Sequence, residues 1–227
     1  MWGLHLRDQL GAVAIAEIQQ NPGKYSQQIL RGTDGLIDHI VASQANRGET
    51  KIRGVDISGS YRLPWSTYGN WDVKMDGTYY DRYDFTAEAG GEWLENIGIV
   101  TNDGRFGGAG PNSGLSGMPQ INPRWKHTAS VGWRMGVWRA QLSQRYNTSL
   151  EDKSPRAGSV LTKVKAYSQW NLTTGYTGFK NVSLSFGINN LMDVNPPVIA
   201  NTLYTGYLTS LADIQGRSYK VSAEYKF

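Results

Sequence analysis

Apolar and polar residues alternate strictly in several segments of this chain. From Gly54 to Leu63, every second residue is apolar, aromatic or glycine, and the residues between them are Asp56, Ser58, Ser60 and Arg62. A period of two is typical of a β-strand that has one apolar and one polar face. The pattern therefore predicts a sheet whose two faces meet different surroundings.

Further segments continue this pattern. We expect strands at residues 2–6, 71–80, 125–134, 138–146, 164–176, 182–189 and 219–227. Most of them have roughly the 9–11 residues of a tilted membrane-spanning strand, and they bring the count to about eight. No stretch approaches the roughly 18 apolar residues that a membrane helix needs. These segments favour an all-β fold.

The connections between the strands alternate in length. Long connections are expected at residues 7–48, 85–121, 149–162 and 191–215, and short turns at 64–69, 135–136 and 177–181. All long loops would then lie at one end of the sheet, as in outer-membrane barrels with short periplasmic turns and long extracellular loops. A soluble sandwich has no reason to sort its loops in this way. The sequence predicts a transmembrane antiparallel β-barrel.

Composition and aromatic placement agree with a barrel wall. The chain has 27 Gly, 13 Tyr and 8 Trp but only 39% hydrophobic residues, which fits strands that are half apolar and half polar. Trp65, Trp71, Trp133, Trp138 and Tyr176 lie beside the short turns, where an interfacial aromatic belt is expected. Ordinary strand propensity of aromatic residues is the alternative explanation.

The inward face carries an excess of positive charge that bears on barrel size. Its expected cations are Arg62, Lys74, Arg82, Lys126, Arg134, Arg139, Arg145, Lys165, Lys220 and Lys226, and its anions are Asp56, Asp72, Asp76 and Glu224. The interior of an eight-stranded closed barrel is filled by side chains, so unpaired cations there would cost several kcal/mol each. A wide, wet lumen or an acidic partner removes this cost. The cations could attract an anionic ligand or pair with such a partner.

No catalytic, cofactor or metal site is expected. The chain has no cysteine, and His5, His39 and His127 lack metal-ligand spacing. The glycine-rich residues 104–118 lack the G-K-[ST] of a phosphate loop, and no G-x-S-x-G motif is present. Lys and Arg are scattered, so nucleic acid is not an expected partner. We therefore do not expect an enzyme.

The C-terminal part carries a recognisable motif. Residues 173–197 read TTGYTGFKNVSLSFGINNLMDVNPP, and the chain ends GRSYKVSAEYKF. This closely resembles the end of TonB-dependent outer-membrane receptors, where a strand runs into N-L-F-D-x-x-P-P, followed by a long loop and a last strand ending in phenylalanine. The matching residues are Asn190, Leu191, Asp193, Pro196 and Pro197, while Met192 replaces the usual phenylalanine. NPGKYSQQILRGTDGLIDHI and NRGETKIRGVDISGSYRLP also resemble a loop and strand of that family.

The resemblance covers essentially residues 1–227 and implies the C-terminal portion of the barrel, about the last eight of about 22 strands. It implies that a signal peptide, a TonB box and a plug domain belong to the missing front part. It further implies energy-coupled uptake of a scarce nutrient, such as a ferric siderophore, across the bacterial outer membrane. The implied partners are outer-membrane lipid, the plug, the TonB complex and a small nutrient ligand.

Two groups of residues are candidate functional residues. Tyr225 and Phe227 resemble the C-terminal signal read by the barrel-assembly machinery, although Phe227 could equally be a lipid anchor. The candidate lumen-facing basic residues are Arg62, Lys74, Arg139, Arg145, Lys165 and Lys220. They are the one feature of the strands with potential ligand-binding chemistry.

Two other architectures remain open. A complete small outer-membrane barrel with a structural or adhesive role requires the first and last strands to pair, and it requires an export signal. A soluble β-sandwich that binds carbohydrate through its tryptophans requires a second sheet over the apolar face.

Overall fold

Strands make up nearly all of the regular structure that is described. The computed structural model describes residues 1–12, 18–19, 22–41, 44–65, 67–86, 90–100, 121–153, 163–199, 207 and 211–227, with the backbone alone at 6–12, 44–48 and 64–65. A short 3-10 helix, η1 (Ser26–Gln28), lies in the first long connection. No helix in these described ranges is long and apolar enough to cross a membrane.

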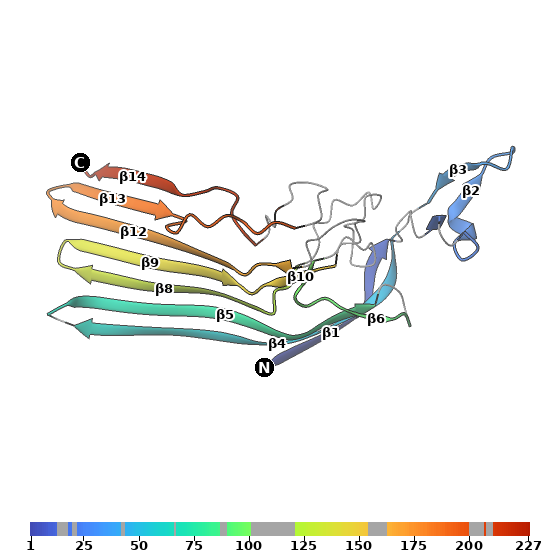
Figure 1. Ribbon diagram of the computed structural model, residues 1–227, viewed down its shortest axis with the longest axis horizontal. Coiled ribbons are helices and arrows are strands. Elements are labelled where there is room, and N and C mark those ends of the chain that lie inside the picture. Colours follow the sequence, from blue (N-terminus) through green and yellow to red (C-terminus); the bar gives the residue numbers. More distant parts are fainter. Residues whose placement is uncertain are drawn as a thin grey trace.

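The main sheet is an antiparallel meander (Figure 1). Its strands, in spatial order, are β1 (Trp2–Ala12), β4 (Gln44–Trp65), β5 (Gly69–Thr86), β8 (Trp125–Met135), β9 (Trp138–Asn147), β12 (Tyr167–Phe179), β13 (Val182–Asn189) and β14 (Ser218–Tyr225). The short strand β6 (Trp93–Glu95) pairs with the far end of β5. The predicted all-β antiparallel fold is confirmed.

The sheet is open. β1 and β14 stand at its two ends and do not pair with each other in the described part of the chain, so the barrel is not closed. The pairing that a complete small barrel requires is therefore missing. A wall segment of a larger barrel has this form, because its edge strands pair with strands outside the segment.

Short turns gather at one end of the sheet and long connections at the other (Figure 1). Gly69, Gly136 and Asn181 have positive φ angles of 86°, 54° and 60°, as tight hairpin turns require. The turn predicted at 135–136 is shifted by one residue, because β8 ends at Met135 and β9 begins at Trp138.

Cross-strand pairing sorts the side chains onto two faces, because directly paired residues point the same way. One apolar row consists of Tyr61, Val73, Val131, Leu142, Leu172, Ile188 and Tyr219. The neighbouring polar row consists of Arg62, Asp72, Gly132, Gln141, Thr173, Gly187 and Lys220. The period of two read from the sequence is present in the sheet.

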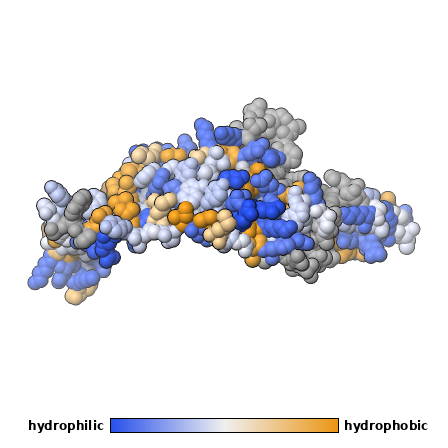
Figure 2. Space-filling view, turned by 90° about the horizontal axis from the view of Figure 1, so that it is seen from below, coloured by the Kyte–Doolittle hydropathy of each residue, from blue (hydrophilic) through white to orange (hydrophobic). Residues whose placement is uncertain are grey.

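The apolar face is not a protein core. Val131 is 38% exposed, Leu184 36% and Val221 78%. Figure 2 shows exposed hydrophobic side chains beside strongly hydrophilic ones. The described residues provide no second sheet over this face, so the soluble sandwich lacks its requirement.

Aromatic residues cluster on the apolar face beside the short turns. Ring centroids lie 6.4 Å apart in Trp71–Trp133, 4.5 Å in Trp138–Tyr176 and 5.2 Å in Tyr176–Phe179. Rings at this level of a barrel wall suit the boundary between hydrocarbon and water.

The packed core of the structure lies among the long connections. β10 (Leu150–Asp152) pairs antiparallel with β11 (Lys163–Val164) and parallel with β7 (Ile99–Val100). The core buried there consists of Val100, Leu150, Val164 and Ile199, with Ile121 and Leu211 packed against it. We call these three strands and this core the loop sheet.

The loop sheet corrects one strand boundary. A membrane strand was expected over residues 164–176, with Val164 on its apolar face, but β12 begins at Tyr167. Val164 belongs to β11 and is 1% exposed within the core of the loop sheet. Its apolar side chain is buried by other loops, and alternation along one strand cannot reveal that contact.

The first long connection contains structure of its own. β2 (Ile29–Arg31) and β3 (Ile37–Ile40) form a hairpin that lies far from the short turns (Figure 1). Ile18, Tyr25 and Ile29 form its small core with Ile40. The loop expected at 7–48 is shorter than predicted, because β1 runs to Ala12 and β4 begins at Gln44.

A β-bulge changes the face of the residues beyond it. Arg53 pairs with Arg82 and Gly54 with Tyr80, which leaves Asp81 as an extra residue in β5. Arg82 therefore shares the face of Arg53, opposite to the polar face of Asp56 and Arg62. The expectation that Arg82 points inward is wrong, because the extra residue reverses the alternation at this point.

Candidate functional site

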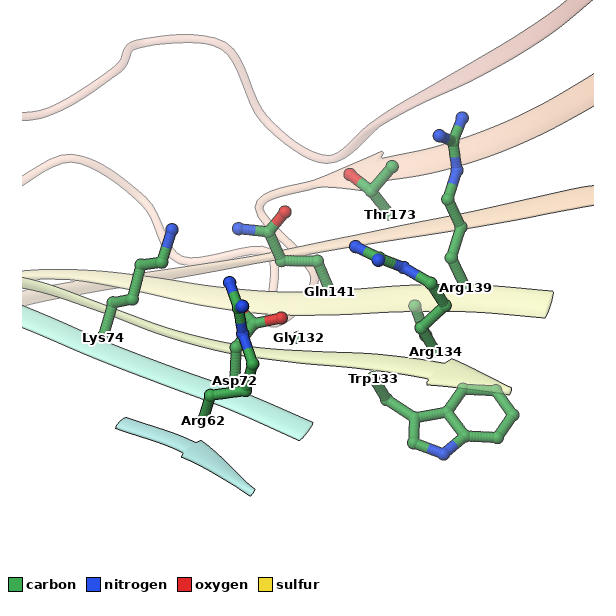
Figure 3. Close-up of a pocket in the computed structure, with 10 residues that line it drawn as sticks. Arg62, Asp72, Lys74, Gly132, Trp133, Arg134, Arg139, Gln141 and Thr173 are labelled. Carbon is green, nitrogen blue, oxygen red and sulfur yellow. The ribbon is translucent and has the colours of Figure 1, made fainter. Parts of the chain in front are cut away.

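The polar face of the main sheet is the candidate functional surface. Near the short turns it contains a groove of about 410 Å³, here called the lower groove. Its charged lining residues are Arg62, Asp72, Lys74, Arg134 and Arg139. In Figure 3 their side chains rise from one side of the strands, and Trp133 points to the other side.

The lower groove has more positive than negative charge. Asp72 is the one carboxylate among its lining residues, against three arginines and a lysine. Within the described part of the chain, none of the four cations forms an ion pair. Arg134 and Arg139 are direct partners across the β8–β9 hairpin. Like charges at such positions are destabilising unless an anion compensates them.

Two glycines make room for charged side chains in this groove. A β-carbon built at Gly132 would lie 2.7 Å from both carboxylate oxygens of Asp72, so this carboxylate lies over the glycine backbone. A β-carbon at Gly175 would collide with Arg139, whose side chain crosses this glycine. Larger residues at Gly132 or Gly175 would displace these charged groups.

A second groove of about 490 Å³, the upper groove, lies farther along the same face. Its lining includes two cations, Lys126 and Arg145, and two carboxylates, Asp56 and Asp76. Ser58 Oγ donates to Asp76 Oδ1 at 2.6 Å, and Thr78 Oγ1 donates to Asp56 Oδ1 at 2.8 Å. The charge of the polar face is thus balanced in the upper groove and positive in the lower one.

The candidate basic residues do not all join this surface. Arg62, Lys74, Arg139, Arg145 and Lys220 lie on the polar face of main-sheet strands. Lys165 lies between β11 and β12, outside the main sheet, because β12 begins later than expected.

The alternation of residues did not predict an aromatic cluster at the loop end of the polar face. Trp2 and Tyr80 meet edge to face at 6.1 Å, and Tyr80 and Tyr83 do so at 6.2 Å. Lys126 Nζ lies 5.6 Å from the centroid of the Tyr80 ring. Tyr83 joins the cluster only because the bulge at Asp81 reverses its direction. The alternation of apolar and polar residues in the sequence gives no sign of that bulge.

The cluster contains polar groups besides its aromatic rings. Trp2 Nε1 is buried and has no acceptor in the described part of the chain. Aromatic rings with N–H and O–H donors suit a ligand that is partly apolar and partly polar.

The C-terminal motif joins three strands. Asn190 is fully buried and has a φ of 52°. Its side-chain amide donates to Val194 O, and its Oδ1 accepts from Val194 N, both at 2.9 Å. Its backbone N donates to Asn171 Oδ1 on β12 at 2.9 Å. Asp193 Oδ1 accepts from Arg217 N, just before β14, at 2.9 Å.

The other motif residues support this turn. Leu191 N donates to Trp170 O at 2.7 Å, which fixes the turn against β12 a second time. Pro196 and Pro197 are half-buried in the segment that follows. The carboxylate of Asp193 accepts a backbone hydrogen bond, so this motif residue has a structural role in the turn.

The two candidate assembly residues lie at the end of β14. The Tyr225 and Phe227 rings meet edge to face at 5.1 Å, and both side chains are exposed. β14 ends at Tyr225, so Phe227 lies just beyond the paired strand.

Within the described ranges, no cluster of three or more His, Asp or Glu side chains has the arrangement of a metal site. His5 and His39 each contact a single carboxylate, Glu49 and Asp38 respectively, on the exposed surface.

An open antiparallel sheet with an exposed apolar face, a polar face and loops sorted by length is the wall of a large outer-membrane-type β-barrel. The chain belongs to the TonB dependent receptor-like, beta-barrel family, whose match covers residues 7–191. Members of this family are transporters and receptors of the bacterial outer membrane.

Solved structures with the same fold agree with this family assignment. The chain is similar to the ferric-catecholate import receptor Fiu from K12 E. coli, with 14% identity and a TM-score of 0.53 over 99% of this chain and 24% of that one. A variant of the ferric enterobactin receptor PfeA from Pseudomonas aeruginosa gives 14% identity and a TM-score of 0.57 over 99% and 28%. The FrpB iron transporter from Neisseria meningitidis gives 15% and 0.55 over 99% and 28%.

The chain spans about a quarter of the length of these receptors. At this level of identity the likeness shows the fold alone. No curated protein matches the chain.

Proposed function

We propose that residues 1–227 form the C-terminal portion of the barrel of a TonB-dependent outer-membrane transporter. The whole protein would take up a scarce nutrient such as a ferric siderophore. The family match over residues 7–191 is the observation that carries this proposal. The names of Fiu, PfeA and FrpB, which refer to ferric catecholate, ferric enterobactin and iron, support iron as the first cargo to test.

In this proposal the two faces of the sheet have separate roles. The apolar face contacts outer-membrane lipid, and the polar face lines a water-filled interior. The loop sheet and the aromatic cluster of Trp2, Tyr80 and Tyr83 lie at the extracellular end, where a ligand would enter. Arg62, Lys74, Arg139, Arg145 and Lys220 would face the lumen.

The remaining partners act through other parts of the protein or its ends. A plug domain and TonB box in the rest of the polypeptide would couple uptake to the inner-membrane proton gradient through the TonB complex. Tyr225 and Phe227 would present the last strand to the barrel-assembly machinery. Their exposure at the end of β14 supports access by a partner.

Uptake by a deletion strain tests the proposed transport. The gene is deleted in an iron-starved culture of the source bacterium, and uptake of radioactive iron is measured from catecholate, hydroxamate and citrate complexes. We expect loss of uptake from at least one complex, restoration by the intact gene, and no restoration when TonB is absent. Unchanged uptake of every iron complex would contradict iron transport. Repeating the assay with cobalamin and oligosaccharides then tests the wider transport role.

A further inference from the structure

The lower groove on the polar face holds positive charge that the described part of the chain does not neutralise. Arg62, Lys74, Arg134 and Arg139 converge on it, and Asp72 is the one acidic lining residue. We propose that the lower groove is a binding site for an oxyanion, a carboxylate or a phosphate group. Arg134 and Arg139 are its principal ligands.

The register of the β8–β9 hairpin is the first support. Arg134 and Arg139 are paired directly, and their guanidinium groups belong to the same face. Alone, two opposed cations repel each other and weaken the hairpin. An oxyanion between them converts repulsion into charge-assisted hydrogen bonds, which arginine makes in a bidentate manner.

The clearance around Arg139 is the second support. Its side chain crosses Gly175 on β12, a position that any larger residue would fill. Figure 3 shows Arg139, Arg134 and Lys74 rising from separate strands on the same side, with Gln141 and Thr173 between them. Gln141 and Thr173 add neutral hydrogen-bond donors to the groove. The groove of about 410 Å³ is large enough for more than one carboxylate or phosphate group.

The contrast with the upper groove is the third support. Lys126 and Arg145 line the upper groove together with Asp56 and Asp76, so local charge is matched there. In the lower groove the positive lining residues outnumber the negative ones, although both grooves lie on the same face of the sheet. If the whole face were simply a solvated basic surface, the excess of positive charge would not be confined to one end.

Two sources could supply the oxyanion: a free anion in the lumen, or an acidic segment from the rest of the polypeptide. The proposed oxyanion site depends on the proposed function in one respect, because both require the polar face to be enclosed within a barrel. Oxyanion binding is measured without transport, so the oxyanion site and the transport function can be disproved separately.

The test uses the purified full-length protein in detergent. The variant pair Arg134→Gln and Arg139→Gln is compared with the matched pair Lys163→Gln and Lys180→Gln, which removes the same charge from exposed positions outside both grooves. Binding of inorganic phosphate and citrate is followed by calorimetry at low salt, and the urea midpoint of unfolding is measured for each protein.

If a free anion is the ligand, phosphate or citrate binds the wild type, and the Arg134/Arg139 pair weakens binding at least about tenfold, as expected for two lost charge-assisted bonds. If an acidic segment is the ligand, the wild type binds neither probe, and the Arg134/Arg139 pair lowers the urea midpoint. The matched pair changes neither result comparably. Absence of binding, with an unchanged or raised midpoint in the Arg134/Arg139 variant, would overturn the proposal, because relief of repulsion alone stabilises the hairpin. Equal effects of the two pairs would overturn it as well.

Discussion

Asn190 shows how a single residue type can be required by both backbone and side chain. Its left-handed φ of 52° favours asparagine or glycine. Its amide also satisfies both the N–H and the carbonyl of Val194 in a fully buried position. Glycine would meet the first requirement and lose the second. The family motif thus has a structural role at this position, which the sequence alone had left undefined.

Replacement of Asn190 should destabilise the last hairpin. In Asn190→Ala, the Val194 N–H and carbonyl lose their partners in a buried turn, and a left-handed alanine is strained. We expect a loss of about 2–4 kcal/mol. Urea unfolding of the full-length protein in detergent measures it. Asn189→Ala is the matched control, because its amide makes only a long bond of 3.4 Å to Ser218 at an exposed site. Equal losses in the two variants would contradict the role assigned to Asn190.

At the scale of elements, the loop sheet is a unit distinct from the barrel wall. β7 comes from one long connection and β10 and β11 from another, while Ile199 of their core comes from a third. This core is buried although the surrounding strands expose both faces. In the proposed transporter, this packing would hold the long connections together at the extracellular end of the barrel. The pairing of β10 with β7 is parallel, unlike every pair in the main sheet.

A buried charge should disrupt the loop sheet and spare the wall. In Val164→Asp, an unpaired carboxylate enters a site that is 1% exposed, which costs about 3–5 kcal/mol. We expect faster proteolysis within residues 148–166, while the barrel keeps its heat-modifiable migration on gels. Lys165→Asp places the same side chain at an exposed position and should leave proteolysis unchanged. Loss of barrel migration in Val164→Asp would show that the two units are not separate.

Alternation predicted the strands of the wall because one residue period determines both faces. The segments 71–80, 125–134 and 182–189 all lie within strands of the main sheet. The bulge at Asp81 and the burial of Val164 could not be predicted, because each depends on a neighbour distant in sequence. The row of basic residues on the polar face was predicted from the alternation, except for Lys165 and Arg82. The cluster of Trp2, Tyr80 and Tyr83 was missed, because it depends on the bulge.

For the whole molecule, the central claim is that the apolar face meets hydrocarbon and the polar face meets water. Val131 and Ser130 are adjacent on β8, at the middle of the wall, and point to opposite faces. In Val131→Arg, a cation on the lipid face should cost about 2–4 kcal/mol of folding free energy. Ser130→Arg should cost well under that, because its cation meets the polar face. Refolding equilibria in lipid vesicles compare the two, and equal costs would contradict the assignment of faces.

Site-directed spin labelling of β8 in the full-length protein tests that claim most directly. Labels are placed one at a time through Thr128→Cys, Ala129→Cys, Ser130→Cys and Val131→Cys, and this chain has no cysteine of its own to compete. In lipid vesicles, labels at 129 and 131 should collide more with oxygen, which dissolves in hydrocarbon, than with a water-soluble nickel complex. Labels at 128 and 130 should show lower oxygen accessibility. Accessibility that does not alternate, or alternates with the opposite phase, would contradict the account.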